Sequence, residues 1–309
     1  MMAEQHRGYD AEVWCWAEDA ADSWRGKYPE FVAGDDMITP IARTPEGELV
    51  GYAVACAKDS SPMFVSRRTG EVWDLLVAPA HRNRGLAGRL MTKVFEQLRS
   101  RGAEDVTLHA AIANTPAIGF YEKLGFQRVM HRMYRRLGDE EGRRSGRAGV
   151  AAACAVRPAR PQDADAAAEM MDALVEQARS YPGRMWAAQD EIVAYWRERF
   201  AGELDEDDMI ALVAEDQAGR PVGFVEAKAT DSEDIFATNR IGEVWNIFVR
   251  RGHRGRGIGR RLMENVFRRQ RAKGCDDVAI HVDLGNGPAF EFYRTLDLRA
   301  VMYRMYRRL

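Results

Sequence analysis

The chain contains two copies of one sequence pattern, and this duplication constrains its fold more than any other feature. Gly85 and Gly257 lie 172 positions apart, each in a run rich in arginine and glycine that follows an apolar segment. The same interval, without a gap, relates Trp14 to Trp186, Gly51 to Gly223, Glu71 to Glu243, His109 to His281 and Tyr121 to Tyr293. Each copy has the size of an ordinary domain of roughly 100 to 150 residues, so we expect two similar domains and no solenoid of short repeats.

The closing segments of the two copies place the domain boundaries. Residues 129–137 and 301–309 differ at a single position, so the first domain is expected to span residues 1–137. Residues 138–154 are the expected linker, because they begin with a polar, glycine-rich stretch that has nothing apolar to bury. Residues 155–309 are then the second domain.

The two copies differ at their start. The second opens with an extended lead-in at 155–161 and a helical pattern at 163–178, which the first copy lacks. Either the first domain has lost its opening strand and helix, or this chain begins later than its original gene product did.

Within each copy the hydrophobic pattern predicts alternating strands and helices. Leu86, Leu90, Val94 and Leu98 fall on one face of a predicted helix that ends near Gly102. Strands are expected at 37–42, 49–57, 71–77 and 105–110, a short helix at 116–124 and a closing strand after it, with counterparts 172 residues later. This order predicts a mixed α/β (α+β) domain, in which helices flank a mixed, mainly antiparallel sheet.

Charge and composition exclude several classes of function. The net charge is −2, and acidic and basic residues alternate without a long basic block, so we expect no nucleic-acid partner and no anionic membrane surface. No apolar stretch approaches the ~20 residues of a membrane span, and the N-terminus lacks the apolar core of a signal peptide. The four cysteines lie far apart, as free thiols in a reducing compartment would. A cytoplasmic protein without a bound metal is expected.

The glycine-rich run is the strongest chemical signal. Glycines at the start of a helix let backbone N–H groups approach an anion, and the helix dipole favours negative charge there. The alternative is a tight strand-to-helix turn with solvated arginines, but two copies in the same context favour phosphate binding. No acidic residue about 20 positions on marks a dinucleotide fold, and no Gly-Lys-Ser/Thr marks a P-loop.

Further motifs carry a resemblance to a known family. The loop pattern Arg/Gln-x-x-Gly-x-Gly/Ala is followed by a helix, a strand and then Asn114-x-x-Ala117-x-x-Phe120-Tyr121-x-x-x-Gly125-Phe126. This succession resembles the acetyl-CoA-binding core of the GNAT superfamily of N-acetyltransferases. The second copy matches with Asn286, Ala289, Phe292 and Tyr293, but it has Asp297-Leu298 in place of Gly125-Phe126.

The resemblance implies acetyl-CoA as acyl donor and assigns it binding residues. The pyrophosphate would lie on Asn83, Arg84, Gly85, Leu86, Ala87 and Gly88, and on Gly255, Arg256, Gly257, Ile258, Gly259 and Arg260. The pantetheine arm would pair, like an added strand, with Leu75, Leu76 and Val77, and with Ile247, Phe248 and Val249. Asn114 and Asn286 would hold either the cofactor arm or the helix that follows.

The resemblance also implies catalytic residues. Attack of an amine on a thioester requires loss of a proton, so a base is expected within reach. Glu71 and Glu243 stand where several superfamily members keep a glutamate base, and His109 and His281 stand where others place theirs. Tyr121 and Tyr293 would donate a proton to the leaving thiolate. The alternatives are strand-edge glutamates, histidines satisfied within the sheet and tyrosines that pack in the core.

The acceptor is expected to be a small-molecule amine, and the second copy is favoured as the main catalyst because it keeps the opening elements. Both domains being active, a protein or peptide amine as acceptor, and a non-catalytic acyl-CoA-binding module stay open as alternatives. The acidic run at 203–208 is either a solvated loop or an attraction for a polycationic acceptor such as an aminoglycoside. The chain is expected to be a monomeric pseudo-dimer or a homodimer.

Overall fold

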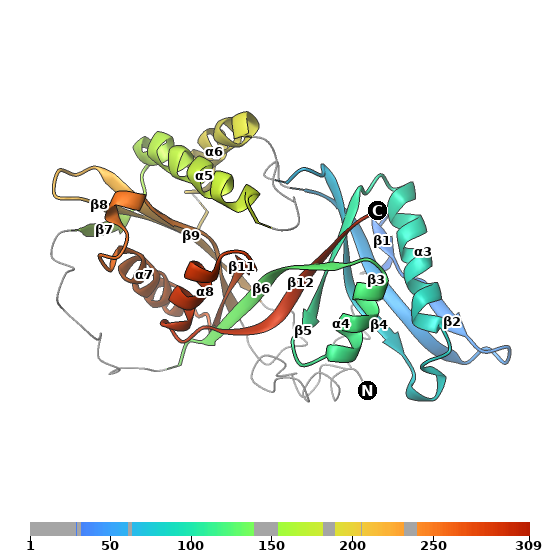
Figure 1. The fold of residues 1–309 in the computed structure, drawn as a ribbon. Coiled ribbons are helices and arrows are strands. Elements are labelled where there is room, and N and C mark those ends of the chain that lie inside the picture. Colours follow the sequence, from blue (N-terminus) through green and yellow to red (C-terminus); the bar gives the residue numbers. More distant parts are fainter. Residues whose placement is uncertain are drawn as a thin grey trace. The chain divides into compact units, whose positions relative to one another are not determined.

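The computed structural model describes residues 29, 32–60, 64–138, 154–181, 189–204, 206–231 and 240–309 (Figure 1). The chain divides into two compact units. The N-terminal unit comprises the described residues up to His131 together with Val301–Leu309. The C-terminal unit comprises Arg132–Tyr181 and the described residues from there to Ala300. Trp14, Trp24, Trp186 and nearly all of the expected linker lie outside the described residues.

The N-terminal unit is a mixed sheet with helices. Its strands are β1 (Met37–Ile38), β2 (Ile41–Arg43), β3 (Leu49–Asp59), β4 (Arg68–Val77), β5 (Asp105–Ala111) and β12 (Arg299–Arg308). The order is β1-β3-β4-β5-β12, with β2 also paired to β3; β4 and β5 are parallel, whereas the other pairs of known register are antiparallel. Its helices are α3 (Leu86–Ser100) and α4 (Thr115–Lys123), and a short 3-10 turn, η1 (Pro79–His81), precedes α3.

The C-terminal unit repeats this plan and adds opening elements. Its strands are β7 (Ala155–Pro158), β8 (Met209–Glu215), β9 (Pro221–Asp231), β10 (Arg240–Val249), β11 (Asp277–Asp283) and, from Arg132 onward, β6 (Gln127–Arg136). The order is β7-β8-β9-β10-β11-β6, and β10 and β11 are parallel. Its helices are α5 (Ala164–Arg179), α6 (Gln189–Glu203), α7 (Ile258–Ala272) and α8 (Gly287–Arg294), with 3-10 turns η3 (Pro161–Asp163) and η4 (Arg251–His253). The predicted mixed, mainly antiparallel fold with two repeats is confirmed.

The closing strands are exchanged between the two sequence repeats. β12 belongs to the second repeat, yet it pairs with β5 from Met302 opposite Ala111 to Arg308 opposite Asp105. β6 belongs to the first repeat, yet it neighbours β11, and the Leu137 N–H donates to the Asp276 carbonyl at 2.7 Å. The compact units therefore do not coincide with residues 1–137 and 155–309, because each sheet is completed by the other repeat.

The exchanged strands contribute to the cores that they join. Met305 of β12 is fully buried among the apolar residues of the N-terminal unit, including Val94 and Leu98 of α3. Met133 of β6 is fully buried in the C-terminal core beside Leu262 of α7. The apolar face predicted for the helix after each glycine loop is the face that packs on the sheet. Each core thus draws on both halves of the sequence.

Candidate active site

A fork between the two parallel strands is the main feature of each unit. The β4–β5 ladder runs from Thr69 opposite Asp105 to Val72 opposite Leu108 and then stops, although both strands continue. The β10–β11 ladder likewise stops at Val244 opposite Ile280. Beyond these points β4 and β10 remain paired on their other side with β3 and β9. The inner edges of the predicted cofactor segments, 75–77 and 247–249, therefore face the fork.

A β-bulge lies at the point where each fork opens. In the N-terminal unit Val54 pairs with Asp74 and Ala55 with Val72, which leaves Trp73 as the extra residue. In the C-terminal unit the same shift leaves Trp245. A bulge bends its strand and increases the local twist, which accounts for the divergence of β4 from β5 and of β10 from β11. Both tryptophans are exposed, at 43% and 37%.

The glycine loops lead from the forks to the helix N-termini. Gly85 caps α3 with φ 76° and Gly257 caps α7 with φ 75°, in the left-handed region that glycine tolerates. Neither cap residue supplies a side-chain hydrogen bond, so the N–H groups of the first helical turn are available to an external acceptor. A Cβ at either glycine would meet nothing within 4 Å. Backbone conformation, and not packing, therefore explains these glycines, and the space beside them is open.

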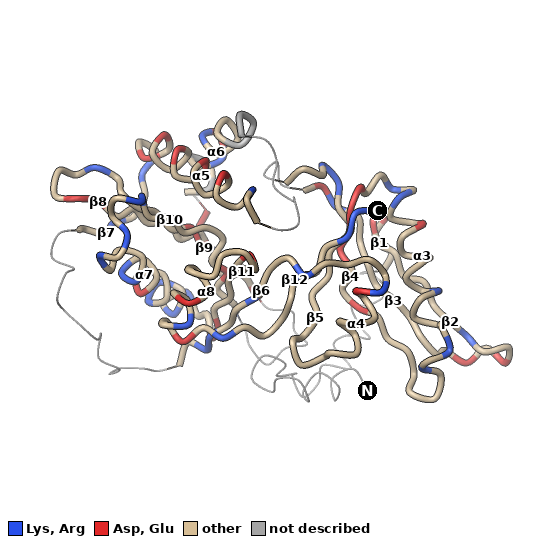
Figure 2. Tube along the Cα trace, viewed as in Figure 1, with Lys and Arg blue, Asp and Glu red and all other residues tan. Residues whose placement is uncertain are grey.

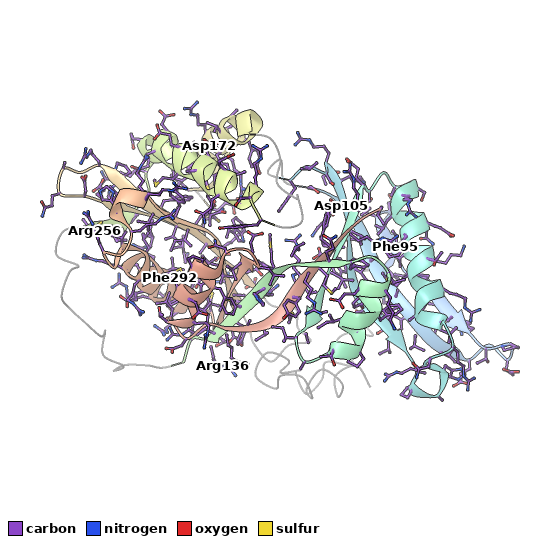
Figure 3. The ribbon with its side chains drawn as sticks, in the orientation of Figure 1. Phe95, Asp105, Arg136, Asp172, Arg256 and Phe292 are labelled. Carbon is purple, nitrogen blue, oxygen red and sulfur yellow. The ribbon has the colours of Figure 1, made fainter. Side chains whose placement is uncertain are left out.

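Arginines fix each loop to the end of its cofactor strand. The Arg82 Nε donates to the Val77 carbonyl at 2.9 Å, and the Arg254 Nε to the Val249 carbonyl at 2.8 Å. Arg256 lies at the tip of the second loop (Figure 3). Basic positions also continue along α7 (Figure 2). The loops therefore combine backbone N–H groups with positive charge, as a pyrophosphate site requires.

The two asparagines act on the helices that follow them. The Asn114 Oδ1 accepts from the Ala117 N–H at 3.3 Å, and the Asn286 Oδ1 accepts from the Ala289 N–H at 3.2 Å. Each side chain thus caps its helix, α4 or α8. Of the two roles left open by the sequence, the geometry displays the helix-holding one.

Glu71 lies in a cluster of charged side chains on the sheet face opposite α3. Burial raises the pKa of its carboxyl, but the Lys58 ammonium, which is hydrogen-bonded to Oε2, and the positive charge of His109 and Arg304 outweigh this. The net pKa of Glu71 lies below its ordinary value of 4.5. His109 is directly opposite Arg304 in the β5–β12 ladder. The structure therefore brings the two predicted bases of this unit together with two cations.

Glu243 has a different cationic partner. Arg132 of β6 donates to its Oε1 at 3.0 Å, and the Glu243 side chain is 35% exposed. His281 lies two residues beyond Ala279, the residue that pairs with Glu243, and so on the same sheet face. The acidic run of this unit is also engaged: Glu206 pairs with Lys228 and Asp208 with Arg240, each at 2.7 Å. These pairs favour a structural role for the run over attraction of a polycation.

The two tyrosines occupy equivalent helical positions in apolar surroundings. The ring of Tyr121 of α4 contacts that of Phe126 edge-on, with 5.8 Å between the ring centroids. Burial, aided by the negative charge of Asp74, raises the pKa of the Tyr121 phenol. Tyr293 of α8 is only 5% exposed, and burial raises the pKa of its phenol as well. Asp74 immediately precedes the cofactor segment of β4. Both phenols are protonated at neutral pH, the form that a proton donor needs.

Two negative observations concern the described parts of the chain. They contain no cluster of three or more His, Cys, Asp or Glu side chains placed to hold a metal ion. They also contain no helix that is long and apolar enough to cross a membrane.

Comparisons with known proteins identify the family. Residues 5–126 and 168–297 match the model of the acetyltransferase (GNAT) family. The chain belongs to this family. The family comprises acetyltransferases, which use acetyl-CoA as donor. The fork and the glycine-capped helix occur in both GNAT repeats.

Individual relatives define how far the likeness extends. A mycothiol acetyltransferase of Saccharomonospora viridis is 37% identical over 90 residues, which are 29% of this chain and 29% of that relative. A GCN5-related N-acetyltransferase of Sphaerobacter thermophilus has a TM-score of 0.58 at 20% identity, with 92% of this chain and 85% of that chain covered. A tandem GNAT protein from the clavulanic acid biosynthesis pathway has a TM-score of 0.54 at 18% identity, with 89% and 84% covered. This chain thus covers less than a third of the mycothiol acetyltransferase's own length, and the structural matches show the fold.

Three side chains at the GNAT sites were missed by the sequence reasoning. Lys58 and Arg304 approach Glu71, and Arg132 pairs with Glu243. The two arginines are themselves related by the 172-residue interval, which was a usable signal. Their partners were not predictable, because each arginine approaches the glutamate of the other repeat. Arg132 of the first repeat pairs with Glu243 of the second, and Arg304 of the second repeat approaches Glu71 of the first.

Proposed function

We propose that this protein transfers the acetyl group of acetyl-CoA to a primary amine of a small molecule by direct attack, with the C-terminal unit as the main catalyst. The observation that carries the proposal is the combination found in that unit: a bulged strand that diverges from its parallel neighbour and ends at a helix N-terminus with open backbone N–H groups. The fork offers a strand edge to a pantetheine arm, and the helix N-terminus offers a site to its pyrophosphate.

The roles of the C-terminal residues follow from this placement. Glu243 or His281, on the face of β10 and β11, would accept the proton of the attacking amine, directly or through a water. Tyr293, held protonated by burial, would donate a proton to the departing CoA thiolate. Arg132 would hold the Glu243 carboxylate in place. The backbone of 247–249 and the N–H groups of 255–260 would bind the cofactor, and in the N-terminal unit 75–77 and 83–88 would do the same.

The preference for the C-terminal unit rests on its opening helix. Arg250, directly after β10, pairs with Glu169 of α5 at 2.9 Å. Gly285 lies so close to Tyr181, just after α5, that a Cβ would fall 2.5 Å from the tyrosine ring. α5 therefore contacts the end of the cofactor strand, and Tyr181 just after it contacts the loop that leads to Asn286. These contacts form one wall beside the fork.

The test is release of free CoA thiol from acetyl-CoA by the purified chain, across aminoglycosides, polyamines, amino acids and short peptides. We expect release above the acceptor-free blank with at least one small amine. Release with peptides alone would replace the small-molecule acceptor by a protein amine. Acetyl-CoA binding without release for any amine would favour the non-catalytic binding module.

A further inference from the structure

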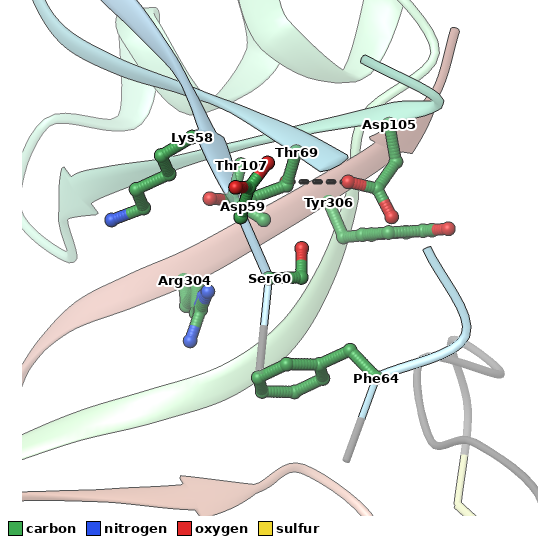
Figure 4. A pocket seen from close by; sticks show the side chains of 9 residues that line it. All are labelled: Lys58, Asp59, Ser60, Phe64, Thr69, Asp105, Thr107, Arg304 and Tyr306. Atoms are coloured by element: carbon green, nitrogen blue, oxygen red, sulfur yellow. Dashed lines mark hydrogen bonds between the residues drawn. The ribbon is translucent and has the colours of Figure 1, made fainter. Parts of the chain in front are cut away.

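A cavity of about 230 Å³ lies on the sheet face of the N-terminal unit opposite α3 (Figure 4). Its lining residues come from the end of β3 and the segment after it, the starts of β4 and β5, and the exchanged strand β12: Lys58, Asp59, Ser60, Phe64, Thr69, Asp105, Thr107, Arg304 and Tyr306. The volume is below the roughly 300–1,000 Å³ of sites for drug-sized ligands, so it suits a smaller molecule. No residue in this lining belongs to the predicted cofactor site, and two of them, Lys58 and Arg304, also approach the predicted base Glu71.

The floor of the cavity holds a buried hydroxyl without a partner. Thr107 is 2% exposed, and its Oγ1 has no hydrogen-bond partner within the described part of the chain. A buried hydroxyl left unpaired is costly, by about 1–3 kcal/mol. A polar ligand atom within reach of this hydroxyl would remove that cost, so the unpaired Thr107 hydroxyl favours a polar occupant of the cavity over an apolar one.

The charges of the lining are divided between two sides. Lys58 and Arg304 lie on one side of the cavity and Asp105 on the other (Figure 4). Arg304 is also opposite His109 in the ladder, so the basic side is the one nearer the fork. Glu71 pairs with Lys58, but two cations against one carboxylate leave the basic side net positive. Such a division favours a ligand that carries both a negative and a positive group, with its negative group toward the fork.

The acidic side has hydrogen-bonding capacity to spare. The Asp105 Oδ2 accepts from the Ser66 hydroxyl and its Oδ1 from the Thr69 hydroxyl, each at 2.5 Å, and the Tyr306 hydroxyl is a third hydrogen-bond partner of this carboxylate. A carboxylate has about four acceptor positions, so an ammonium group of a ligand can still be accommodated. Asp59, the other acid of the lining, is 85% exposed and paired with Arg68 at 2.8 Å. Asp105 is therefore the acid that would meet the ligand.

Three of the nine lining residues distinguish this cavity from the second repeat. Lys58, Thr69 and Thr107 correspond to Thr230, Ile241 and Ala279 in the second repeat. Asp105, Arg304 and Tyr306 instead correspond to the same residue types, Asp277, Arg132 and Tyr134. The shared residues fit a role in the sheet of both units, whereas the replaced ones distinguish a ligand of the first.

We propose that this cavity is a binding site for a small amino acid in its zwitterionic form. The carboxylate of the ligand lies toward Lys58 and Arg304, its ammonium group lies toward Asp105, and the Thr107 hydroxyl bonds to it at the floor. The ammonium group then points away from the fork, so the site holds its ligand without presenting that amine for transfer. The assignment goes beyond the proposed acetyl transfer and does not require it.

Binding of each of the standard free amino acids to the full chain, measured by calorimetry without acetyl-CoA, tests this assignment. We expect at least one amino acid to bind with a Kd near or below ~1 mM. Its decarboxylated amine and its deaminated acid should each bind about tenfold or more weakly, because each lacks one charged hydrogen-bonding group. An acid analogue that binds as well as the amino acid would leave only an anion site and overturn the assignment.

Two variants locate the binding. Thr107→Ala and Lys58→Thr introduce the residues that the second repeat already has, and each should weaken binding about tenfold. Thr230→Ala, an exposed position on the equivalent strand of the C-terminal unit, is the matched control and should leave the affinity unchanged. Binding that survives both variants, or no binding by any amino acid at about 10 mM, would overturn the proposal. Neither result bears on the proposed acetyl transfer, which the release of CoA thiol tests separately.

Discussion

Truncation of a buried methionine in each closing strand tests the exchange of strands between the repeats. Met305 is fully buried in the N-terminal core although it belongs to the second repeat, and Met133 is fully buried in the C-terminal core although it belongs to the first. Replacing a buried methionine by alanine costs about 2–5 kcal/mol, because packing is lost and a cavity remains. Met305→Ala should therefore destabilise the N-terminal unit, and Met133→Ala the C-terminal unit.

Hydrogen exchange read by mass spectrometry separates the two effects. A loss of 2 kcal/mol lowers protection against exchange about thirtyfold, since 1.4 kcal/mol corresponds to a factor of ten. Met305→Ala should lower protection mainly in peptides from α3 and β5, and Met133→Ala mainly in peptides from α7 and β11. Each variant is the control for the other. If Met305→Ala acted mainly on α7 and β11, the exchanged topology would be refuted.

Three further predictions follow from single side chains. Gln270 is fully buried, and neither of its amide atoms is hydrogen-bonded to a described residue. Its counterpart in the first repeat is a leucine, so Gln270→Leu should raise the free energy of unfolding by about 1–3 kcal/mol. A lower free energy of unfolding in chemical denaturation would contradict this. Tyr293→Phe should lower turnover far more than Tyr121→Phe, and equal losses would instead support two active units. The lowered pKa of Glu71 contributes stability above its unfolded value near 4.5 that is lost as the pH falls through the folded value. Lys58→Thr should therefore lower the free energy of unfolding by less than about 1 kcal/mol at pH 7, since Lys58 is 52% exposed. This difference in free energy between variant and unchanged chain should vanish in acid, and a difference that is independent of pH would exclude the ion pair.

Much of the fold was predictable because the chain contains two copies of the same pattern, which can be compared with each other. A glycine loop that occurs twice before an amphipathic pattern indicates the strand-loop-helix unit, and both loops do lead from a strand to a helix. The backbone conformation is similar in the two copies even where the residue differs: Asn83 has φ 60°, and its counterpart Gly255 has φ 73°. Asp297 similarly adopts φ 62° where the first repeat has Gly125 at φ 86°. Asparagine and aspartate tolerate this region better than other non-glycine residues.

The exchange of closing strands could not be predicted. Residues 129–137 and 301–309 differ at one position, so the hydrophobic pattern of either strand fits either sheet. The bulges at Trp73 and Trp245 were also hidden, since an extra residue in one strand leaves no mark in a single sequence. The partners Arg132 and Lys58 were missed for the same reason: pairing across strands depends on register, and register is fixed by tertiary contacts.

The most direct test of the account measures both products of one reaction. The purified chain is incubated with acetyl-CoA and the amine that gives the largest thiol release, and free CoA and acetylated amine are quantified together. The account predicts equal amounts of the two products and loss of both in Tyr293→Phe. Thiol release without an acetylated amine, or acetyl-CoA binding with neither product, would contradict acetyl transfer to an amine.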